Sequence, residues 1–452
     1  MILAIDQGTT GTTCLVVDDD LNVVRRGYAE LPQHYPRPGW VEHDAEEIWA
    51  TVLAASEQAG LDGVDALAIA NQRETTVLWD RRTGRPVAPA IVWQDRRTAD
   101  RCRALDPESI RARTGLVPDP YFSATKLEWL LRERPAEGLA FGTVDSWLVW
   151  NLTQGGVHVT DATNASRTLL CNLAELAWDD DLLALFGVDR SVLPRIVASS
   201  GDLAEAELLG ARLPLRGIAG DQQAALYAQG CRGPGEAKAT YGTGTFVLEH
   251  TGDDATLPPP GLLQTAAVDG YAFEGAVLVS GAALQWLRDG LGLIAAAAET
   301  EAIAHSVVSS EGVVFVPSLT GLGSPWWDAD ARGLVAGITR GTTRAHLVRA
   351  ALEAIAHQVA DIVDAFPDPL TVLRADGGAA ANGFLMQFQS DLLGLPVEVA
   401  AERETTALGA AALAAGRGMR VAIGETYESQ CSCDEAATLR EGWLEALNRS
   451  RT

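Results

Sequence analysis

Short apolar runs separated by polar turns open the chain and predict strands. Residues 2–5 and residues 14–17 are apolar, and the glycine- and threonine-rich stretch between them is typical of a turn. Asp44 precedes a run that begins with acids and continues with an apolar pair, which predicts the N-cap and first turn of a helix. Residues 66–70 are continuously apolar and predict a buried strand. This alternation of strands and helices indicates an α/β domain.

The second half of the chain repeats the pattern. Residues 239–248 again show a strand, a glycine- and threonine-rich turn, and a strand. A predicted strand at residues 371–375 runs into the turn of residues 376–378, and residues 384–393 predict a helix. Two similar turns in two α/β halves predict a duplicated architecture with a cleft between the halves.

Length and composition agree with two globular domains. A chain of 452 residues is too long for a single core, and its 47% hydrophobic and 21% charged residues are ordinary for a globular protein. The glycine-rich stretch of residues 230–235 is typical of a connector, whereas the proline-rich residues 257–261 form only a loop. We therefore predict an N-terminal domain at residues 1–230 and a C-terminal domain at residues 231–452.

The charge of the chain excludes some partners. A net charge of −25 disfavours nucleic acid and anionic membrane surfaces, which would be repelled. Apolar runs are too short to cross a bilayer, and the first residues lack a basic segment, so we expect a cytoplasmic protein without membrane insertion. The six cysteines and seven histidines show no metal-ligand spacing. Lysine is almost absent, with only Lys126 and Lys238.

The glycine-rich turns carry the candidate chemistry. In residues 6–10, glycine lets the backbone approach a phosphate, threonine adds hydroxyl donors, and Asp6 could hold Mg²⁺ through water. Each turn alone is most often structural. The turns at residues 6–10, 242–244 and 376–378 all follow predicted strands, and together they indicate a nucleotide held between two halves. The Walker and Rossmann glycine patterns are both missing.

Several motifs together resemble the FGGY family of carbohydrate kinases, over about residues 2–418. The matching segments are residues 6–10, 38–44, 71–76, 92–98, 119–126, 220–225, 241–244, 285–289, 320–323 and 376–378, with Asn382. The resemblance implies two domains with the ribonuclease H-like fold of actin and hexokinase, and a cleft between them for ATP and substrate. Residues 71–76 are among the segments that distinguish the glycerol-phosphorylating members of the family.

The resemblance also implies an activity. It predicts ATP-dependent phosphorylation of glycerol to sn-glycerol 3-phosphate, the first step of glycerol catabolism, with Mg²⁺ and with Asp221 as the general base. The implied partners are glycerol and ATP or ADP, and the protein is expected to form a homo-oligomer, a dimer or a tetramer. Without the resemblance, Asp221 would be read equally well as a helix N-cap.

The polyol site implied by the resemblance is formed by polar and aromatic residues. Polar contacts to the hydroxyls are expected from Arg73, Glu74, Tyr121, Asp221 and Gln222. Trp93 and Phe246 are expected to form apolar walls against the carbon chain. Seen alone, adjacent Arg73 and Glu74 would be read as a surface ion pair, and the two aromatic residues as ordinary core residues.

The nucleotide site implied by the resemblance draws on both halves. Terminal phosphates are expected at the first turn, Thr9, Thr10, Gly11 and Thr12, and at Thr243. The ribose and adenine are expected beside Gly281, Gln285, Gly378 and Asn382. Gln285 and Asn382 fall on predicted helices, where a polar side chain is usually only solvated. Asp6 is expected to orient Mg²⁺ through its water shell.

The chain departs from the family at three places. Thr13 stands where the family has an arginine that reaches toward the phosphates, so weaker ATP binding or a slower reaction is expected. Residues 205–212 lack the family's regulatory sugar-bisphosphate loop and its phosphorylated histidine, so we expect neither regulation. From about residue 421 the chain no longer follows the family.

Two other functions remain open at this point. The first is the same reaction on a larger polyol, such as a tetritol or a ketopentose. The second is a nucleotide-binding regulatory or scaffold protein on the same fold, because one architecture can serve several functions. The set of Arg73, Glu74, Trp93 and Tyr121 argues against the larger polyol, and the retained Asp221 argues against the scaffold.

Overall fold

A first mixed sheet forms from the apolar runs of the N-terminal half. The computed structural model describes residues 1–451. The strand order of this sheet is β13 (Ser200–Leu208), β14 (Ala211–Gly220), β5 (Ala66–Asn71), β1 (Ile2–Gln7), β2 (Gly11–Val17) and β3 (Val23–Glu30). Strands β1, β5 and β14 are parallel, with Asp6 opposite Ala70 and Gly220 opposite Asn71. The ends of these three strands therefore meet at one edge of the sheet.

The strand predicted at residues 66–70 is confirmed as β5, all of whose residues are buried. The helix predicted after Asp44 is confirmed as α1 (Ala45–Ala59), and the Asp44 carboxylate accepts a hydrogen bond from the backbone N–H of Glu46. This bond satisfies one of the free N–H groups of the first helical turn.

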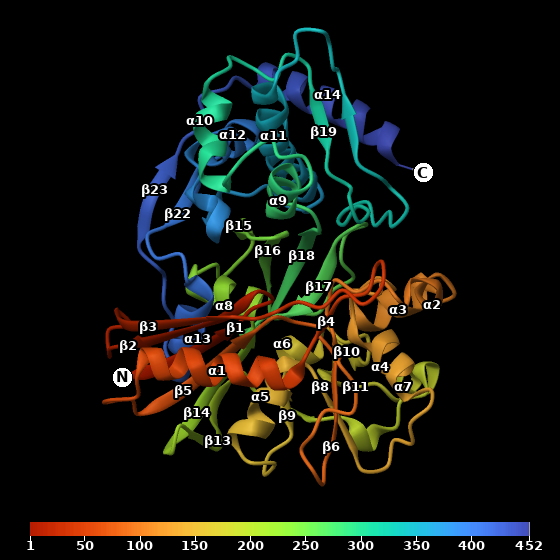
Figure 1. The fold of residues 1–452 in the computed structure, drawn as a ribbon, viewed down its shortest axis with the longest axis vertical. Coiled ribbons are helices and arrows are strands. Elements are labelled where there is room, and N and C mark those ends of the chain that lie inside the picture. Colours follow the sequence, from red (N-terminus) through yellow and green to blue (C-terminus); the bar gives the residue numbers. More distant parts are fainter. Residues whose placement is uncertain (452) are drawn as a thin grey trace.

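Helices cover both faces of the first sheet. Leu3 and Ile5 point to the face that α1 and α5 (Val144–Leu152) cover, whereas Ala4 points to the other face. That other face is covered by α8 (Asp221–Ala228) and α13 (Thr405–Ala414). Helix α13 comes from the far end of the sequence, and Figure 1 shows it in blue against the red strands of the N-terminal sheet.

The contact between α8 and α13 is very close. A Cβ atom on Gly409 of α13 would lie 1.9 Å from the carbonyl oxygen of Ala224 on α8. Alanine and glycine dominate the buried residues of this layer, including Ala219, Ala228 and Ala411. Small side chains let the two helix backbones approach, so α13 sets the position of the helix that begins with Asp221.

A second mixed sheet forms from the C-terminal half. Its order is β17 (Leu263–Ala266), β18 (Tyr271–Val277), β16 (Thr245–Gly252), β15 (Glu236–Tyr241), β21 (Val372–Asp376), β22 (Val397–Ala400) and β23 (Ile423–Tyr427). Strands β15 and β21 are parallel, with Thr240 opposite Asp376. The turns that follow these strands therefore lie side by side, as the corresponding turns of the first sheet do.

Further helices of the C-terminal half pack on and around this second sheet. They are α9 (Gly281–Asp289), α10 (Thr300–His305), α11 (Arg344–Val363), α12 (Gly383–Leu393) and α14 (Cys433–Ser450). The helix predicted at residues 384–393 is confirmed as α12. Strand β23 and helix α14 form the part of the chain after residue 420, for which the sequence predicted no structure. A short hairpin of β19 (Val314–Val316) and β20 (Leu334–Ala336) contacts α14.

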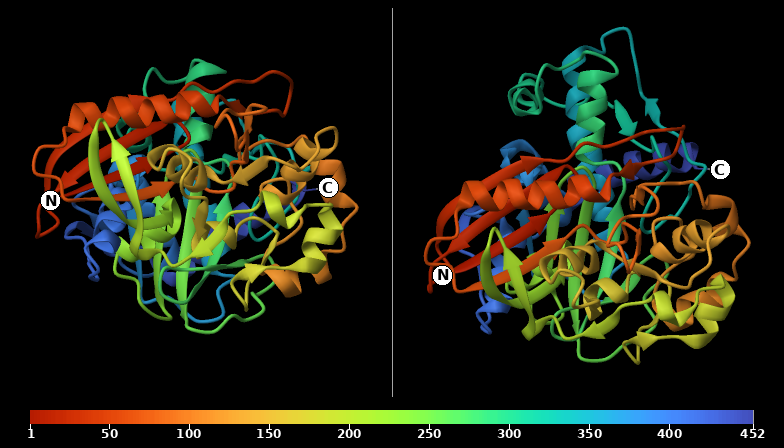
Figure 2. Two further views of the ribbon diagram at one scale, coloured as in Figure 1. Left: turned by 90° about the horizontal axis from the view of Figure 1, so that it is seen from below. Right: turned by 60° about the horizontal axis from the view of Figure 1, so that its bottom comes forward.

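The segment between β5 and β14 folds beside the first sheet, where Figures 1 and 2 show it in orange and yellow. Besides α5, its helices are α2 (Ala99–Arg103), α3 (Pro107–Thr114), α4 (Ser123–Leu131), α6 (Ala162–Ala165) and α7 (Asp180–Phe186). Its short strands are β6 (Val77–Asp80), β7 (Ala90–Ile91), β8 (Leu139–Gly142), β9 (Val159–Asp161), β10 (Cys171–Asn172), β11 (Ala177–Trp178) and β12 (Arg195–Val197); β7 pairs with β4 (Glu42–His43).

This segment shares a core with the second sheet. Leu248 of β16 and Ala272 and Ala276 of β18 pack among apolar side chains of the segment, such as Phe122 and Phe141. The two halves of the chain are therefore joined by apolar packing at this end of the cleft. Within residues 1–451, no helix is both long enough and apolar enough to span a membrane.

Candidate active site

A cavity of about 520 Å³ lies where the strand ends of the two sheets face each other. The turns after β1, β15 and β21 form its walls, together with the first residues of α8. Its lining residues are Asp6, Gly8, Thr9, Thr10, Arg73, Trp93, Tyr121, Asp221, Gln222, Thr240, Gly242, Thr243, Gly244, Phe246, Asp376, Gly377, Gly378, Arg403, Glu404 and Thr406. The three glycine-rich turns singled out in the sequence thus meet at one cavity.

Aromatic side chains form one end of this cavity. The ring centroid of Trp93 lies 5.6 Å from that of Tyr121 and 5.9 Å from that of Phe246, both in edge-to-face contact. The indole Nε1 of Trp93 donates a hydrogen bond of 2.8 Å to Thr9 Oγ1. The aromatic residues are largely buried yet border the cavity, so they can bind a short carbon chain between them.

Asp221 opens helix α8 at the edge of the aromatic end. The N-cap position belongs to Gly220, so the reading of Asp221 as the N-cap is wrong by one residue. The Asp221 carboxylate accepts a hydrogen bond of 2.7 Å from the backbone N–H of Gln222, and its Oδ1 lies 3.2 Å from Nε of Arg73. The side chain keeps 25% of its surface exposed. A carboxylate that is held in place and still accessible can accept a proton from a bound hydroxyl.

Arg73 and Glu74 are buried, with 2% and 1% exposure, so the alternative of a surface ion pair is wrong. Glu74 has a positive φ of 59°, which is unusual for a residue other than glycine and is found most often at functional sites. Its carboxylate accepts a hydrogen bond of 2.6 Å from Nε of Arg167. Glu74 therefore lies behind Arg73 and outside the cavity wall, whereas Arg73 lines the cavity.

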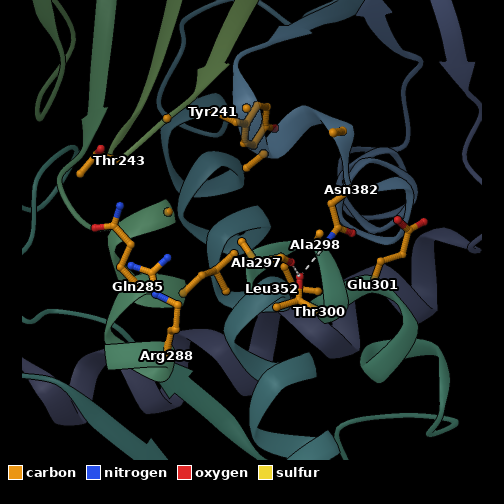
Figure 3. Close-up of a pocket in the computed structure, with 16 residues that line it drawn as sticks. Tyr241, Thr243, Gln285, Arg288, Ala297, Ala298, Thr300, Glu301, Leu352 and Asn382 are labelled. Carbon is orange, nitrogen blue, oxygen red and sulfur yellow. Dashed lines mark hydrogen bonds between the residues drawn. The ribbon is translucent and has the colours of Figure 1, made fainter. Parts of the chain in front are cut away.

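A second cavity, of about 480 Å³, lies between the second sheet and its helices (Figure 3). It brings together all the residues of the C-terminal half that the sequence predicted for the nucleotide: Thr243, Gly281, Gln285, Gly378 and Asn382. Ala297, Ala298, Leu352 and Ala379 add apolar surface, and Arg288 and Glu301 add charge. Such a mixture of apolar walls and a few polar groups is typical of a small-molecule site.

Asn382 lies just before a helix. It is the N-cap of α12, where its Oδ1 accepts a hydrogen bond from the backbone N–H of Leu385, so its predicted place on a helix is wrong by one residue. Its Nδ2 donates a hydrogen bond of 3.0 Å to Thr300 Oγ1, drawn as a dashed line in Figure 3. Asn382 thereby joins two walls of the cavity.

The two cavities share Gly242, Thr243 and Gly378. A Cβ atom on Gly281 would lie 2.6 Å from the carbonyl oxygen of Gly242, so only glycine fits where α9 meets this turn. A ligand in the second cavity would therefore reach the first cavity past two glycines and the short side chain of Thr243.

Carboxylates gather on the cavity wall opposite the aromatic end. Asp6 Oδ1 and Asp376 Oδ1 are buried and have no hydrogen-bond partner among the described residues. Burial raises the pKa of Asp6 well above its usual value, and the nearby carboxylates of Asp221, Glu404 and Asp376 raise it further. A cation at this wall would relieve the repulsion.

These carboxylates fit a hydrated magnesium ion better than a complete metal cage. In residues 1–451, no three histidine, cysteine, aspartate or glutamate side chains are grouped so that they could hold a metal ion by themselves. Magnesium usually keeps several water molecules and binds through one or two carboxylates and the phosphates of its substrate. The free oxygens of Asp6 and Asp376 are of the right kind for such contacts.

Part of the first predicted turn does not reach either cavity. Gly11 and Thr12 belong to β2, and the Thr12 hydroxyl makes a buried hydrogen bond of 2.7 Å with Thr51 on α1. The Thr12 side chain is therefore directed at α1 on the opposite face of the strand, so only its backbone remains for the predicted contact with a nucleotide. Thr13 pairs with Asp6 on β1 and does not line the cavities either.

Several charged residues of the site were not predicted from the sequence. Lys238 is fully buried, and its Nζ donates hydrogen bonds to Gln222 Oε1 and Thr240 Oγ1. Its rarity and its place before a glycine turn could have indicated it. Glu274 interrupts an otherwise apolar strand, which is a weaker signal. Arg167 and Arg403 stand in segments with no distinctive pattern.

Comparisons with known proteins cover the whole chain. The N-terminal domain of the FGGY family of carbohydrate kinases matches residues 1–228, and the C-terminal domain of that family matches residues 237–416. The chain is 50% identical to the glycerol kinase of Rhodopirellula baltica over 100% of this chain and 90% of that protein. It is also 50% identical to the glycerol kinase of Deinococcus radiodurans over 100% of this chain and 97% of that protein.

Solved structures show the same architecture. The glycerol kinase of Plasmodium falciparum, solved with ADP, superposes with a TM-score of 0.88 at 33% identity, covering 99% of this chain and 98% of that one. A xylulose kinase from Lactobacillus acidophilus superposes with a TM-score of 0.86 at 21% identity, covering 99% and 97% of the two chains. The second likeness concerns the fold alone.

Proposed function

The chain belongs to the FGGY family of carbohydrate kinases, and from this premise we propose that it transfers the terminal phosphoryl group of ATP to glycerol, forming sn-glycerol 3-phosphate. One observation carries the proposal: a polar and aromatic cavity around Asp221 adjoins a second cavity of similar volume, which can hold a nucleotide. The full-length similarity to glycerol kinases supports glycerol as the acceptor.

The proposed polyol site uses the aromatic end of the first cavity. Trp93 and Phe246 contact the carbon chain, and Arg73, Tyr121 and Gln222 contact the hydroxyls. Sites that pair every substrate hydroxyl reject analogues that lack one, because their own polar groups would then be left unpaired. Glu74 reaches the polyol only if its side chain turns away from Arg167, so we propose an indirect role for it.

The proposed reaction begins at one hydroxyl of the polyol. Its oxygen attacks the γ-phosphorus of ATP while Asp221 accepts the hydroxyl proton, and the bond between the γ-phosphorus and the bridging oxygen breaks to release ADP. Catalysis of this type depends mainly on position and charge neutralisation. The contact between Arg73 and Asp221 keeps the carboxylate directed at the cavity.

The proposed nucleotide site spans both cavities. Thr9 and Thr10 of the first half and Thr243 of the second contact the terminal phosphates, and the backbone near Gly11 supports that turn. Gly281, Gln285, Gly378 and Asn382 contact the ribose and adenine. The proposed magnesium ion, held through water by Asp6, neutralises phosphate charge when it is bound. Gathered carboxylates would otherwise repel ATP.

Replacing the proposed base tests this function. We expect Asp221→Asn to lower glycerol-dependent ADP release by about a hundredfold or more, because removing a general base costs roughly that factor. The measurement is ADP release with Mg·ATP across a panel of glycerol, tetritols and ketopentoses. Asp180→Asn is a matched control, since Asp180 opens α7 as Asp221 opens α8 but is exposed and paired with Arg190 away from the cleft.

The panel separates the remaining functions. Turnover of a larger polyol but not of glycerol would show that the larger polyol is the phosphoryl acceptor. If no polyol is turned over, a nucleotide-binding regulatory protein is the remaining function. An Asp221→Asn variant as active as the wild-type protein would contradict the role of Asp221 while leaving the acceptor in place.

A further inference from the structure

A buried cluster of ion pairs surrounds Arg73 and crosses from one half of the chain to the other. Arg73 and Glu74 follow β5 of the first sheet, and Arg167 follows α6. Glu274 comes from β18 of the second sheet. All four side chains are at most 2% exposed, and the two positive and two negative charges balance.

Glu274 forms a bidentate ion pair with Arg73 through both of its carboxylate oxygens. Nη1 of Arg73 lies 2.7 Å from Oε2 of Glu274, and Nη2 lies 2.9 Å from Oε1. Nη2 of Arg167 approaches the same Oε1 at 3.0 Å. Burial alone would raise the pKa of Glu274, but the adjacent Arg167 and Arg73 bring that pKa below its usual value. Glu274 is therefore an ionised, bidentate partner of the guanidinium group.

This bidentate ion pair determines which edge of the Arg73 guanidinium group faces Asp221. Glu274 occupies the edge formed by the two Nη atoms, and only Nε remains for Asp221, at 3.2 Å. Weaker contacts to Gln223 Oε1 at 3.3 Å and to the Tyr121 hydroxyl at 3.4 Å complete the surroundings of the guanidinium. A planar guanidinium held at both ends of one edge cannot rotate about its long axis.

The strand that carries Glu274 is itself held in place. Ala272, Glu274 and Ala276 alternate along β18 and so point to one face of the second sheet. The two alanines pack in the core shared with the segment between β5 and β14. Glu274 is thus a charged member of an apolar contact between the halves, and it reaches the polyol site from rigid structure.

We propose that Glu274 is a positioning residue, which holds Arg73 so that its Nε faces Asp221 and its guanidinium forms part of the polyol site. This inference rests on the proposed phosphorylation of glycerol. Without the carboxylate of Glu274, the guanidinium is free to pair through both Nη atoms with Asp221, its next nearest carboxylate partner. The base would then be withdrawn from the substrate hydroxyl. A buried ion pair is weak grounds for a role in stability, whereas orientation is a role that it fulfils well.

The test is a double-mutant cycle that combines Glu274→Gln with Arg73→Lys. We expect Glu274→Gln alone to lower kcat/KM for glycerol by roughly ten- to a hundredfold, as small misplacements of catalytic groups do. The KM for Mg·ATP is expected to change by less than about twofold, because Arg73 does not line the second cavity, where the ribose and adenine are proposed to bind. In the Arg73→Lys background, Glu274→Gln should add less than about twofold, since its effect acts through Arg73.

Glu249→Gln is the matched control. Glu249 is a buried glutamate on β16, the strand next to β18, and it accepts a hydrogen bond of 2.8 Å from the backbone N–H of Gly235 outside the cleft. We expect the Glu249→Gln substitution to leave kcat/KM for glycerol within about twofold of the wild-type value. A similar loss of activity in both variants would point to general damage from a neutralised buried carboxylate and would overturn the proposal.

The outcomes separate this proposal from the proposed function. Wild-type protein that does not phosphorylate glycerol contradicts the function itself. Active wild-type protein with additive effects in the cycle, or with an equal change in the KM for Mg·ATP, contradicts only the role of Glu274. If Glu274→Gln does not fold, Glu274→Asp keeps the charge and shortens the side chain, and a partial loss confined to glycerol kinetics is expected. Failure of both variants to fold would make Glu274 structural and overturn the proposal.

Discussion

Lys238 is a buried residue beside the cleft whose charge depends strongly on its surroundings. Burial lowers the pKa of Lys238 to about 8, although the nearby carboxylates of Asp376 and Asp221 oppose this shift. Its ammonium group donates to Gln222, which lines the proposed polyol site. The protonated form balances the carboxylates around it, so the state of Lys238 should matter to both activity and stability.

We predict that Lys238 changes activity and stability in opposite directions as the pH rises through about 8. Loss of the Lys238 proton removes the balancing charge, so kcat/KM for glycerol should fall above that pH. The unfolded chain keeps this proton up to its usual pKa of 10.5, so it binds more protons than the folded protein across this window. Lys238 by itself should therefore add about 3 kcal/mol to the free energy of unfolding between these pH values, measured as the difference between the wild-type protein and Lys238→Met. Both quantities can be measured, by kinetics and by urea unfolding.

Lys126 offers the comparison for this prediction. Burial lowers its pKa to about 8 as well, but its Nζ donates to the backbone oxygen of Tyr121, and the carboxylates that act on it are those of Glu74, Asp95 and Asp119 instead of Asp376 and Asp221. Lys238→Met should remove the alkaline fall in kcat/KM together with the contribution of Lys238 to the free energy of unfolding above pH 8. Lys126→Met should remove a contribution of similar size to the free energy of unfolding and leave the alkaline fall in kcat/KM in place. An alkaline fall that persists in Lys238→Met would contradict the assignment.

The site residues predicted from the sequence divide according to what a motif can encode. Motif residues on turns, such as Thr10, Asp221 and Thr243, lie at the cavities because strand ends meet there. Thr12, next to the same turn, points to α1, because alternation along β2 places it on the opposite face. Glu274 and Arg167 depend on contacts between distant segments, which no local pattern contains.

At the scale of elements, the close pair α8 and α13 determines where the proposed base lies. Strand β5, helix α1 and helix α12 could be predicted because apolar runs and caps are local signals. The packing of α13 on the first sheet could not, since its alanine-rich sequence fits any buried face equally well. The packing of β23 and α14 could not be predicted either, because it depends on contacts with β22 and α12.

We predict that Gly409→Ala harms both folding and catalysis. The added Cβ would meet the backbone of Ala224 at 1.9 Å, so α8 must move and Asp221 must move with it. Overpacking of this kind should lower the free energy of unfolding by about 1–3 kcal/mol. Misplacement of the base should lower kcat by roughly tenfold or more. Thermal unfolding and steady-state kinetics measure the two effects.

Gly442→Ala is the matched change in another helix. A Cβ atom on Gly442 of α14 would meet nothing within 4 Å. Alanine has the higher helix propensity, so this variant should gain up to about 1 kcal/mol with unchanged kcat. If Gly409→Ala behaved like Gly442→Ala, the close approach of α8 and α13 would not be needed for catalysis.

At the scale of the whole molecule, the dominant property is acidity. The 60 acidic residues outnumber the 35 lysines and arginines, and the net charge is −25. Such an excess destabilises a compact state through self-repulsion. The cytoplasmic location, the homo-oligomer and the domain boundary at residue 230 stay predictions, because each depends on more than the pattern of one chain.

We predict that salt stabilises the protein. Raising the ionic strength from 0.1 M to 1 M shortens the Debye length from about 10 Å to about 3 Å and screens the excess negative charge. The Tm should rise by roughly 2–4 °C, the shift that about 1 kcal/mol produces in a domain of this size. Calorimetry in sodium chloride measures it. The rise should shrink at about pH 5, where carboxylates begin to be protonated; a flat Tm at neutral pH would contradict the prediction.

The position of α13 also has a consequence for biosynthesis. The first sheet uses residues from the start of the chain, yet one of its faces is covered by residues 405–414. Until residues 405–414 have been translated, the alanine- and leucine-rich face of this sheet therefore lacks α13 and has only α8 to cover it. During most of translation this apolar face therefore stays partly exposed or is bound by a chaperone, because α13 is among the last elements to be synthesised. Completion of the N-terminal half is thus a late event in the synthesis of this protein.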